Sequence, residues 1–166
     1  LLKYLPNMLA CHIGIIHDIQ GPSNSITCGE ASAHIAIIEA RDVIARGGAD
    51  VALAGGGEAK LNPFTIMRQC LLGRTTPATD EPATACRPFD AAANGSVFGD
   101  GAGLIVMEDI EYARKRGAAI LAEVLGAGES NNISLNPARV EDSGKGLQIA
   151  IEKALAESNV RPEELD

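Results

Sequence analysis

The stretch GPSNSITCGEASAH, residues 21–34, holds the side chains best placed for chemistry. A short strand near Ser25 to Thr27 is expected to run through a glycine turn into a helix, a layout that often presents a catalytic residue. The residue at the turn is Glu30, and Cys28 stands two positions before it. Thiolates and carboxylates are both favoured at a helix N-terminus, where the peptide dipoles leave partial positive charge. This stretch is therefore the first candidate for a reactive site.

His34 follows Glu30 by four residues, so the two side chains would face each other across one turn of the predicted helix. A structural hydrogen bond between them is the favoured interpretation, and a catalytic pair is the alternative. The other cysteines and histidines form no C-x-x-C pair; they are Cys11, Cys70, Cys86, His12 and His17. The sequence indicates neither a zinc site nor a disulfide framework, and a reducing cytoplasm is the expected location.

The charge of the chain excludes some classes of partner. Lys and Arg number 14 against 22 Asp and Glu, which gives a formal net charge of −8. Binding of nucleic acid or an anionic membrane needs clustered basic residues, and the basic run at 114–116 is expected to be a solvated helix end. The apolar run at 35–45 is broken by Glu39, Arg41 and Asp42, so it is not the ~20-residue segment of a membrane span.

Two glycine clusters invite comparison with nucleotide-binding loops. GGG at 55–57 and GDGAG at 99–103 both miss the G-x-G-x-x-G spacing, and no glycine is followed by Lys-Ser or Lys-Thr. We expect these glycines to allow sharp turns or the close approach of backbones. A dinucleotide-binding dehydrogenase is accordingly disfavoured.

The elements that must position the reactive stretch alternate between strands and helices. The helix at 31–46 is apolar on nearly every side and is expected to be buried. The strand at 49–59 is apolar at successive positions, as in a strand covered on both faces. Further predicted elements are a helical segment at 1–20, loop and short helix at 61–95, strands at 96–109 and 118–130, a short helix at 110–117, a loop at 129–142 and a last helix from 145. The alternation predicts the α/β class, with helices covering a mostly parallel sheet.

Four motifs occur in a recognisable order: GPSNSIT leading into the buried helix, GGADVALAGGGEA, RPFDAAANGSVFGDGAGLIVMED and YARKRGAAILAEVLGAG. Together they resemble the β-ketoacyl-acyl carrier protein synthases, the condensing enzymes of fatty-acid and polyketide assembly. The resemblance covers essentially the whole chain and implies a thiolase-like, layered αβαβα fold, present as an internal fragment of a longer polypeptide. It makes residues 1–117 the later part of the N-terminal half and 118–166 the start of the C-terminal half.

In that family a nucleophilic cysteine stands nine residues after the glycine of the GP pair, and the count from Gly21 ends at Glu30. Counting back from GGADVALAGG gives the same position without a gap. A carboxylate is a weak nucleophile toward thioesters and its acyl product would be a hydrolysis-prone anhydride, so acyl transfer through Glu30 is not expected. Cys28 is the remaining substitute, but strand alternation would aim it away from the carrier's pantetheine arm. A small buried core residue is the favoured interpretation of Cys28.

The resemblance leaves two functions open. The first is a ketosynthase-like partner that does not condense, similar to the chain-length factors, which usually carry glutamine in place of the cysteine. The second is an active 3-oxoacyl-acyl carrier protein synthase, or a malonyl decarboxylase, with altered chemistry at Glu30 or Cys28. The two catalytic histidines of the family correspond to positions after residue 166, and none of His12, His17 or His34 matches them.

The implied partners are an acyl carrier protein, which brings its own phosphopantetheine, and a second subunit in a homodimer or a heterodimer with a ketosynthase. No metal or dissociable cofactor is implied. Because carrier proteins are acidic, a docking patch on this acidic chain must be local, and Arg41, Arg68 and Arg74 are its candidate members. Residues 87–90 and 99–103 match the RPFD and G-[ED]-G-A-G motifs and are expected to be scaffold.

Overall fold

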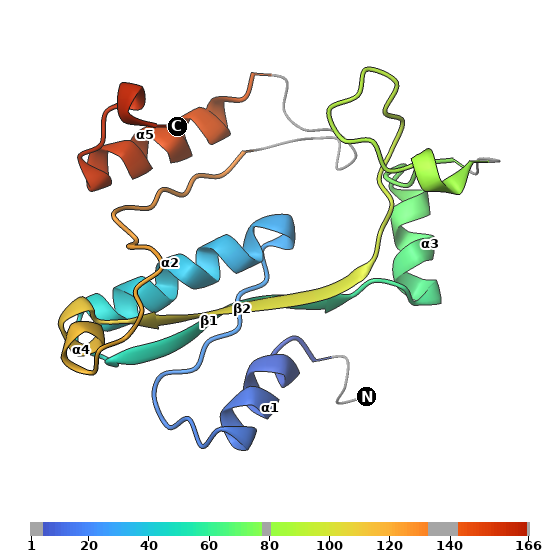
Figure 1. The fold of residues 1–166 in the computed structure, drawn as a ribbon. Helices are drawn as coiled ribbons and strands as arrows, with labels where there is room; N and C mark the ends of the chain where they lie inside the picture. Colours follow the sequence, from blue (N-terminus) through green and yellow to red (C-terminus); the bar gives the residue numbers. More distant parts are fainter. Residues whose placement is uncertain (1–4, 78–80, 133–142, 166) are drawn as a thin grey trace. The chain divides into compact units, whose positions relative to one another are not determined.

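The computed structural model describes residues 5–77, 81–132 and 143–165. Helices and strands alternate along these residues, as the sequence predicts (Figure 1). In chain order the elements are α1 (Met8–Ile16), the 3-10 helix η2 (Gly29–Ala31), α2 (Ser32–Ala45), β1 (Val51–Ala59), α3 (Pro63–Leu71), η3 (Pro82–Thr84), β2 (Asp100–Glu108), α4 (Ile110–Lys115), α5 (Lys145–Ser158) and η4 (Pro162–Glu164). Within the described ranges, no helix has both the length and the apolar character needed to cross a membrane.

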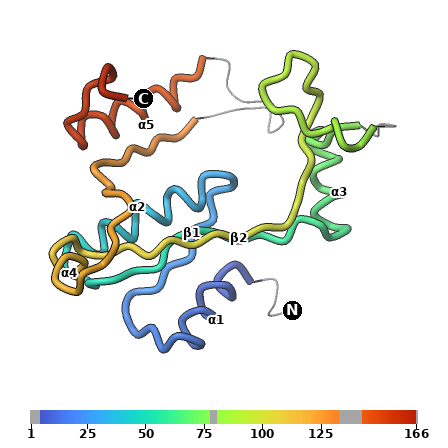
Figure 2. The backbone as a smooth tube through the Cα atoms, viewed as in Figure 1, coloured from blue at the N-terminus to red at the C-terminus, as the bar shows by residue number. Residues whose placement is uncertain are grey.

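The chain divides into two compact units, each built from separated segments. Of the described residues, unit 1 contains 5–57, 102–130 and 146–165, and unit 2 contains 58–77, 81–101, 131–132 and 143–145. In Figure 2 the backbone runs along β1 to α3 and returns along β2 to α4. By residue number the chain leaves unit 1 after Gly57, within β1, and re-enters it at Ala102, within β2. The two strands therefore carry the chain from one unit to the other. Most of the loop predicted at 129–142 lies outside the described residues.

β1 and β2 form a two-stranded sheet. The main-chain N–H of Asp109 donates to the carbonyl oxygen of Asp50 over 3.0 Å, while Gly57 lies against Ala102. Residue numbers thus rise along one strand as they fall along the other, and the strands are antiparallel. The prediction of a mostly parallel sheet is wrong for this pair, because the alternation of elements does not fix strand direction when a long irregular segment joins them.

Helices cover both faces of the sheet in unit 1 (Figure 1). A Cβ built on Gly56 would lie 3.1 Å from the Cβ of Ala33 in α2. A Cβ built on Gly57 would lie 3.0 Å from a methyl carbon of Leu9 in α1. Because successive residues of a strand point to opposite faces, α2 and α1 lie on opposite sides of β1. This layering agrees with the predicted α/β class.

Glycine is required at one position of β1 by the neighbouring strand. A Cβ on Gly55 would overlap the carbonyl oxygen of Gly103 and would lie 2.9 Å from the Cα of Leu104. The expectation that the GGG cluster lets backbones approach closely is confirmed here. The glycines of GDGAG differ, because a Cβ on Gly99, Gly101 or Gly103 would meet nothing within 4 Å. Nothing in the described part of the chain explains those three glycines.

The hydrophobic core of unit 1 is small. Ala40, Ala54 and Met107 form a buried cluster, against which partly buried Ile37, Ile44 and Ala52 pack. Val43 and Ala113 are the other buried apolar residues among those described. The buried residues of α2 are Ala40 and Val43, which share one side of the helix. The prediction of a helix buried on nearly every side is therefore correct for one side of α2 only. The other apolar side chains of α2 are at least partly exposed in the described structure.

Residues 118–130 run as irregular chain beside α5, so the strand predicted there is wrong for the described structure. A Cβ on Gly128 would overlap the carbonyl oxygen of Ala150, and one on Gly126 would lie 2.6 Å from the nitrogen of Ser158. This segment therefore packs on the backbone of a helix and has no described strand beside it to complete a ladder.

The short strand predicted near Ser25 to Thr27 is also absent from the described structure. A strand needs a neighbour that accepts and donates its main-chain hydrogen bonds. No described segment pairs with residues 22–28, so they carry neither helix nor strand. The sequence pattern was correct about the turn that follows and wrong about the element that precedes it.

The described part of unit 2 contains α3, whose start follows local rules. The side-chain oxygen of Asn62 accepts from the main-chain N–H of Thr65 over 3.0 Å, and Pro63 occupies the first turn. Asp100, the acidic residue of GDGAG, accepts from the main-chain N–H of Leu61 over 2.9 Å. Asp100 thus ties the start of β2 to the residues that follow β1, which is a structural role.

Candidate active-site turn

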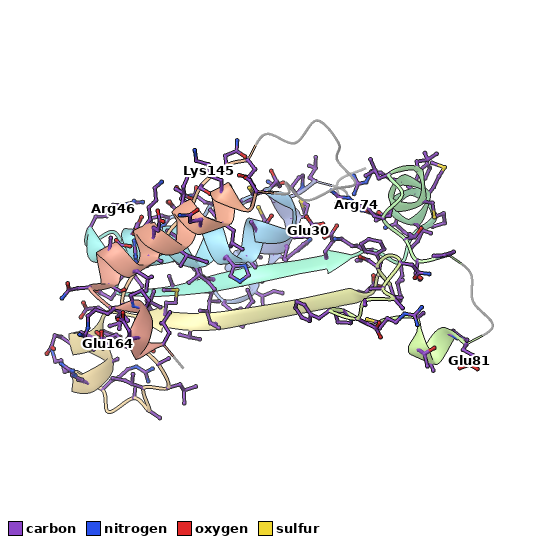
Figure 3. The ribbon with its side chains drawn as sticks, turned by 90° about the horizontal axis from the view of Figure 1, so that it is seen from above. Glu30, Arg46, Arg74, Glu81, Lys145 and Glu164 are labelled. Atoms are coloured by element: carbon purple, nitrogen blue, oxygen red, sulfur yellow. The ribbon has the colours of Figure 1, made fainter. Side chains whose placement is uncertain are left out.

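The turn at residues 28–32 presents Glu30 at the N-terminal end of α2 (Figure 3). Gly29 has a φ of +58°, in the left-handed region that suits glycine. Glu30 is the middle residue of the 3-10 turn that follows, and it is exposed. The glycine turn that the sequence predicts ahead of the helix is therefore confirmed, with Glu30 on it.

Ser32 bonds to this turn through its hydroxyl group. The hydroxyl oxygen accepts from the main-chain N–H of Cys28 over 2.8 Å, and the hydroxyl donates to the carbonyl oxygen of Gly29 over 2.7 Å. Ser32 was not predicted as a functional residue. The available signal was a serine directly after a glycine turn, because short hydroxyl side chains bond readily to nearby backbone groups.

Cys28 lies at the start of the same turn and is exposed. The prediction of a small buried core residue is therefore wrong for the described structure. The physical reason is the absent strand: no described segment pairs with residues 22–28, and the described part of unit 1 leaves the thiol exposed. Cys28 thus stays a candidate for chemistry beside Glu30.

The remaining candidate side chains are spread over the chain. His34 is exposed on α2, and its proposed hydrogen bond to Glu30 stays a prediction. Cys11 is partly buried in α1, where the amide of Asn7 donates to its sulfur over 3.6 Å. Cys70 and Cys86 belong to unit 2. Among the described residues no group of three His, Cys, Asp or Glu side chains could hold a metal ion.

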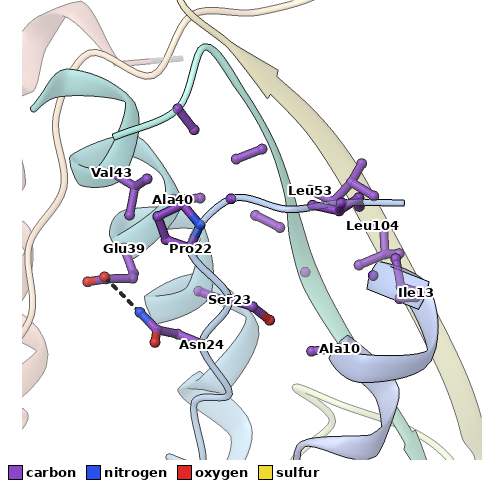
Figure 4. A pocket seen from close by; sticks show the side chains of 18 of the residues that line it. Ala10, Ile13, Pro22, Ser23, Asn24, Glu39, Ala40, Val43, Leu53 and Leu104 are labelled. Carbon is purple, nitrogen blue, oxygen red and sulfur yellow. Dashed lines mark hydrogen bonds between the residues drawn. The ribbon is translucent and has the colours of Figure 1, made fainter. Parts of the chain in front are cut away.

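A cavity of about 860 Å³ lies in unit 1 between α1, the loop before η2, α2 and β1 (Figure 4). Its lining is mostly apolar and includes buried Ala40. At its wall the amide of Asn24 donates to Glu39 Oε1 over 3.1 Å, which ties the GPSN loop to α2. The residues of the 28–32 turn do not line the cavity. Its lining does come close to the turn in sequence, because it includes Ile26, two residues before Cys28, and Ala36, six residues after Glu30.

Arg41, a candidate for the docking patch, is engaged within unit 1. Its guanidinium donates to Glu157 Oε2 and to Asp42 Oδ1, each over 2.8 Å. Hydrogen bonds from Arg41 and then from the main-chain N–H of Ala127 hold the pKa of Glu157 below its ordinary value. Glu157, and after it Asp42, raises the pKa of Arg41. The charge of Arg41 is balanced locally, and the residue joins α2 to α5.

The other two candidate docking residues, Arg68 and Arg74, belong to unit 2. Arg68 is exposed on α3, and Arg74 is half-buried beyond the end of that helix. The main-chain N–H of Arg74 donates to the carbonyl oxygen of Gln69 over 3.0 Å. A docking patch that includes Arg68 and Arg74 stays a prediction.

Comparison with known proteins identifies the family to which this chain is similar. The profile of the family Beta-ketoacyl synthase, N-terminal domain, matches residues 1–113. The chain is 36% identical over 164 residues to the Oxytetracycline polyketide putative beta-ketoacyl synthase 1 of Streptomyces rimosus. It is 36% identical over 162 residues to the chloroplastic 3-oxoacyl-[acyl-carrier-protein] synthase I of Arabidopsis thaliana. Each match covers 98% of this chain but 38% and 34% of those proteins, so the chain spans little more than a third of their length.

Solved structures show the same relationship. The chain matches, with a TM-score of 0.88 and 28% identity, a chain from a complex of a type II PKS acyl-carrier protein with its ketosynthase bound to the hexaketide. That match covers 95% of this chain and 38% of the other. The crystal structure of a beta-ketoacyl synthase from Burkholderia phymatum gives a TM-score of 0.81 at 31% identity, covering 94% and 37%. The fold is accordingly that of the thiolase-like ketosynthases, as the sequence motifs implied.

Proposed function

Because the chain belongs to the β-ketoacyl synthase family, we propose that the protein carrying it serves fatty-acid or polyketide assembly as a ketosynthase-like partner that does not itself condense acyl groups. One observation carries this proposal. Glu30 stands nine residues after Gly21, on the turn before α2, where the resemblance to the family expects the nucleophilic cysteine. A substitution at this one position removes the chemistry on which condensation depends.

Condensation needs a nucleophile that can hold an acyl group. A condensing enzyme takes the acyl group from a carrier thioester, keeps it as its own thioester, and adds it to the carbanion formed when malonyl carrier loses carbon dioxide. A cysteine thiolate suits the first step because it is a strong nucleophile and is stabilised at a helix N-terminus. The carboxylate of Glu30 attacks thioesters poorly, and its anhydride would hydrolyse. An ionised Glu30 would also repel the malonyl carboxylate.

The proposed partners follow from this role. An acyl carrier protein would deliver acyl or malonyl groups on its own phosphopantetheine arm, so the role needs no resident cofactor. A condensing ketosynthase would pair with this protein in a heterodimer, and a homodimer is the alternative. The fold match to a chain from a complex of an acyl-carrier protein with its ketosynthase supports the choice of partner.

The exposed thiol of Cys28 favours a second candidate function, an active synthase or malonyl decarboxylase with altered site chemistry. Cys28 shares the turn with Glu30 and is accessible. The two relatives described above are both named as synthases. In this case Cys28 would carry the acyl group, and Glu30 would serve as a general base or take no part.

The two functions separate in a condensation assay on the full protein with malonyl and acyl carrier proteins. The first proposal predicts no 3-oxoacyl product from the wild type, with or without Cys28→Ala. It also predicts that Glu30→Gln, which keeps the size of the side chain and removes its charge, releases carbon dioxide from malonyl carrier faster than the wild type. Product from the wild type that disappears in Cys28→Ala would overturn the first proposal in favour of the second.

A further inference from the structure

We propose that Ser32 is a positioning residue whose hydroxyl group fixes the turn that presents the side chain of residue 30. The role given to residue 30 rests on the proposed function, whereas the hydrogen bonds of Ser32 are independent of it. Ser32 Oγ accepts from Cys28 N–H over 2.8 Å and donates to the Gly29 carbonyl over 2.7 Å.

The hydroxyl group therefore bridges two backbone groups that precede residue 30 in the chain. The main-chain N–H of Ser32 also donates to the Gly29 carbonyl, and Ala31 N–H donates to the Cys28 carbonyl over 3.2 Å. These contacts enclose Glu30 in a loop that is closed by Ser32. Because Gly29 adopts a φ of +58° and has no side chain to hold it there, the conformation of the turn depends on such bonds.

The start of α2 lacks the side-chain cap that α3 and α4 possess. Asn62 caps α3 and Asp109 caps α4 with side-chain oxygens that accept main-chain N–H groups. Neither Cys28, ahead of η2, nor Ala31, ahead of α2, makes a side-chain cap hydrogen bond. Ser32 satisfies the N–H of Cys28 from inside the helix instead. Its hydroxyl thus bonds back to a main-chain N–H ahead of the helix, as the glutamate side chain of a capping box does.

Removal of the hydroxyl should change the presentation of residue 30 more than the folding of the chain. Ser32→Ala deletes the acceptor for Cys28 N–H and one donor to the Gly29 carbonyl, and the main-chain bonds of the turn remain. The turn should then sample more conformations. Misplacement of a reacting atom by about 1 Å can cost on the order of 100-fold in rate, so reactions that need a fixed orientation at residue 30 should suffer most.

The first measurement is amide hydrogen exchange of the full protein, followed through peptides that cover residues 26–33. We expect at least tenfold faster exchange in this segment for Ser32→Ala, near-normal exchange for Ser32→Thr, which keeps a hydroxyl, and no local change for Ser158→Ala. Ser158 is a matched control because its hydroxyl also donates to a main-chain carbonyl, that of Leu155, over 3.2 Å. Unchanged exchange in Ser32→Ala would overturn the inference.

The second measurement uses Glu30→Cys as the background, with peptide mass spectrometry to assign modification to residue 30. Ser32→Ala should slow acyl transfer from an acyl carrier thioester at least tenfold, leave alkylation by the small reagent iodoacetamide within about twofold, and be rescued by Ser32→Thr. Equal losses in both reactions, together with a lower thermal midpoint, would reduce Ser32 to a folding role and overturn the inference.

The two proposals fail in different ways. In the first case, Glu30→Cys is alkylated but takes no acyl group, and Ser32→Ala still accelerates local hydrogen exchange. Residue 30 is then not the nucleophile position of the family, but the structural role of Ser32 stands. In the second case, Glu30→Cys is acylated equally fast with and without the Ser32 hydroxyl. The nucleophile position is then at residue 30, and the positioning role of Ser32 is overturned.

Discussion

Gly55→Ala tests the strand register that connects β1 to β2. The added methyl group would overlap the carbonyl oxygen of Gly103, and it would lie 2.9 Å from the Cα of Leu104, closer than real Cβ atoms approach. Both obstacles are backbone atoms, so no side chain can rotate to relieve the overlap. Gly55 also has a φ of +154°, which residues with a side chain rarely adopt. Overpacking and backbone strain together predict a loss of about 2–5 kcal/mol in the free energy of unfolding.

The control is Gly103→Ala, on the facing strand, where an added Cβ would meet nothing within 4 Å. We expect this variant within about 0.5 kcal/mol of the wild type, because an alanine at an unobstructed position also reduces the entropy of the unfolded chain. Thermal unfolding of the full protein, followed by circular dichroism, should show a midpoint roughly 5 °C or more lower for Gly55→Ala alone. Equal midpoints for the two variants would refute the register.

Three further predictions concern packing, capping and charge. Met107→Ala, in the core of unit 1, should destabilise the protein by about 2–5 kcal/mol in a urea titration, and a loss below 1 kcal/mol would contradict the burial. Asp109→Ala removes the oxygen that accepts from two N–H groups of α4, and it should lower the free energy of unfolding by about 1 kcal/mol. Asp109→Asn, which keeps an accepting oxygen, should retain most of this stability. Because Arg41 lowers the pKa of Glu157 below about 4.5 in the folded protein, the stability that Glu157 contributes is present above pH 4.5 and is lost as the pH falls through the lowered value. Glu157→Gln should therefore destabilise at pH 7 and approach the wild type in acid, and a constant difference across this range would refute the ion pair.

The sequence predicted elements where local chemistry decides them. The glycine turn before α2, the helix itself and the glycine-rich strand all follow from residue types at adjacent positions. The order of motifs also identified the family, which the profile match over residues 1–113 supports.

The predictions failed where the outcome depends on distant partners. Residues 25–27 and 118–130 have strand-like composition, but no described segment pairs with either of them. Cys28 was expected to be a small buried core residue, but it is exposed where no described segment covers it. The direction of β2 relative to β1 depends on a long intervening segment that no local pattern encodes. The sequence pattern of a segment indicates whether it can form a strand, whereas the strand forms only if another segment lies beside it and pairs with it.

The turn that carries Glu30 was predictable in position and not in detail. Counting residues from Gly21 placed Glu30 on the turn, and the structure has it there. The contribution of Ser32 was not predicted, because a side chain that bonds backward to Cys28 and Gly29 is recognisable only when the turn geometry is known. The engagement of Arg41 with Glu157 was likewise hidden, since 116 residues separate them in sequence.

The most direct test of the account is the intact mass of the full protein after incubation with acyl carrier thioesters, with Glu30→Cys measured in parallel. We expect no acyl adduct on the wild type and a single acyl adduct on Glu30→Cys, mapped to residue 30. A stable adduct on the wild type, at Cys28 or at any other residue, would contradict it and would make the protein an active acyltransferase.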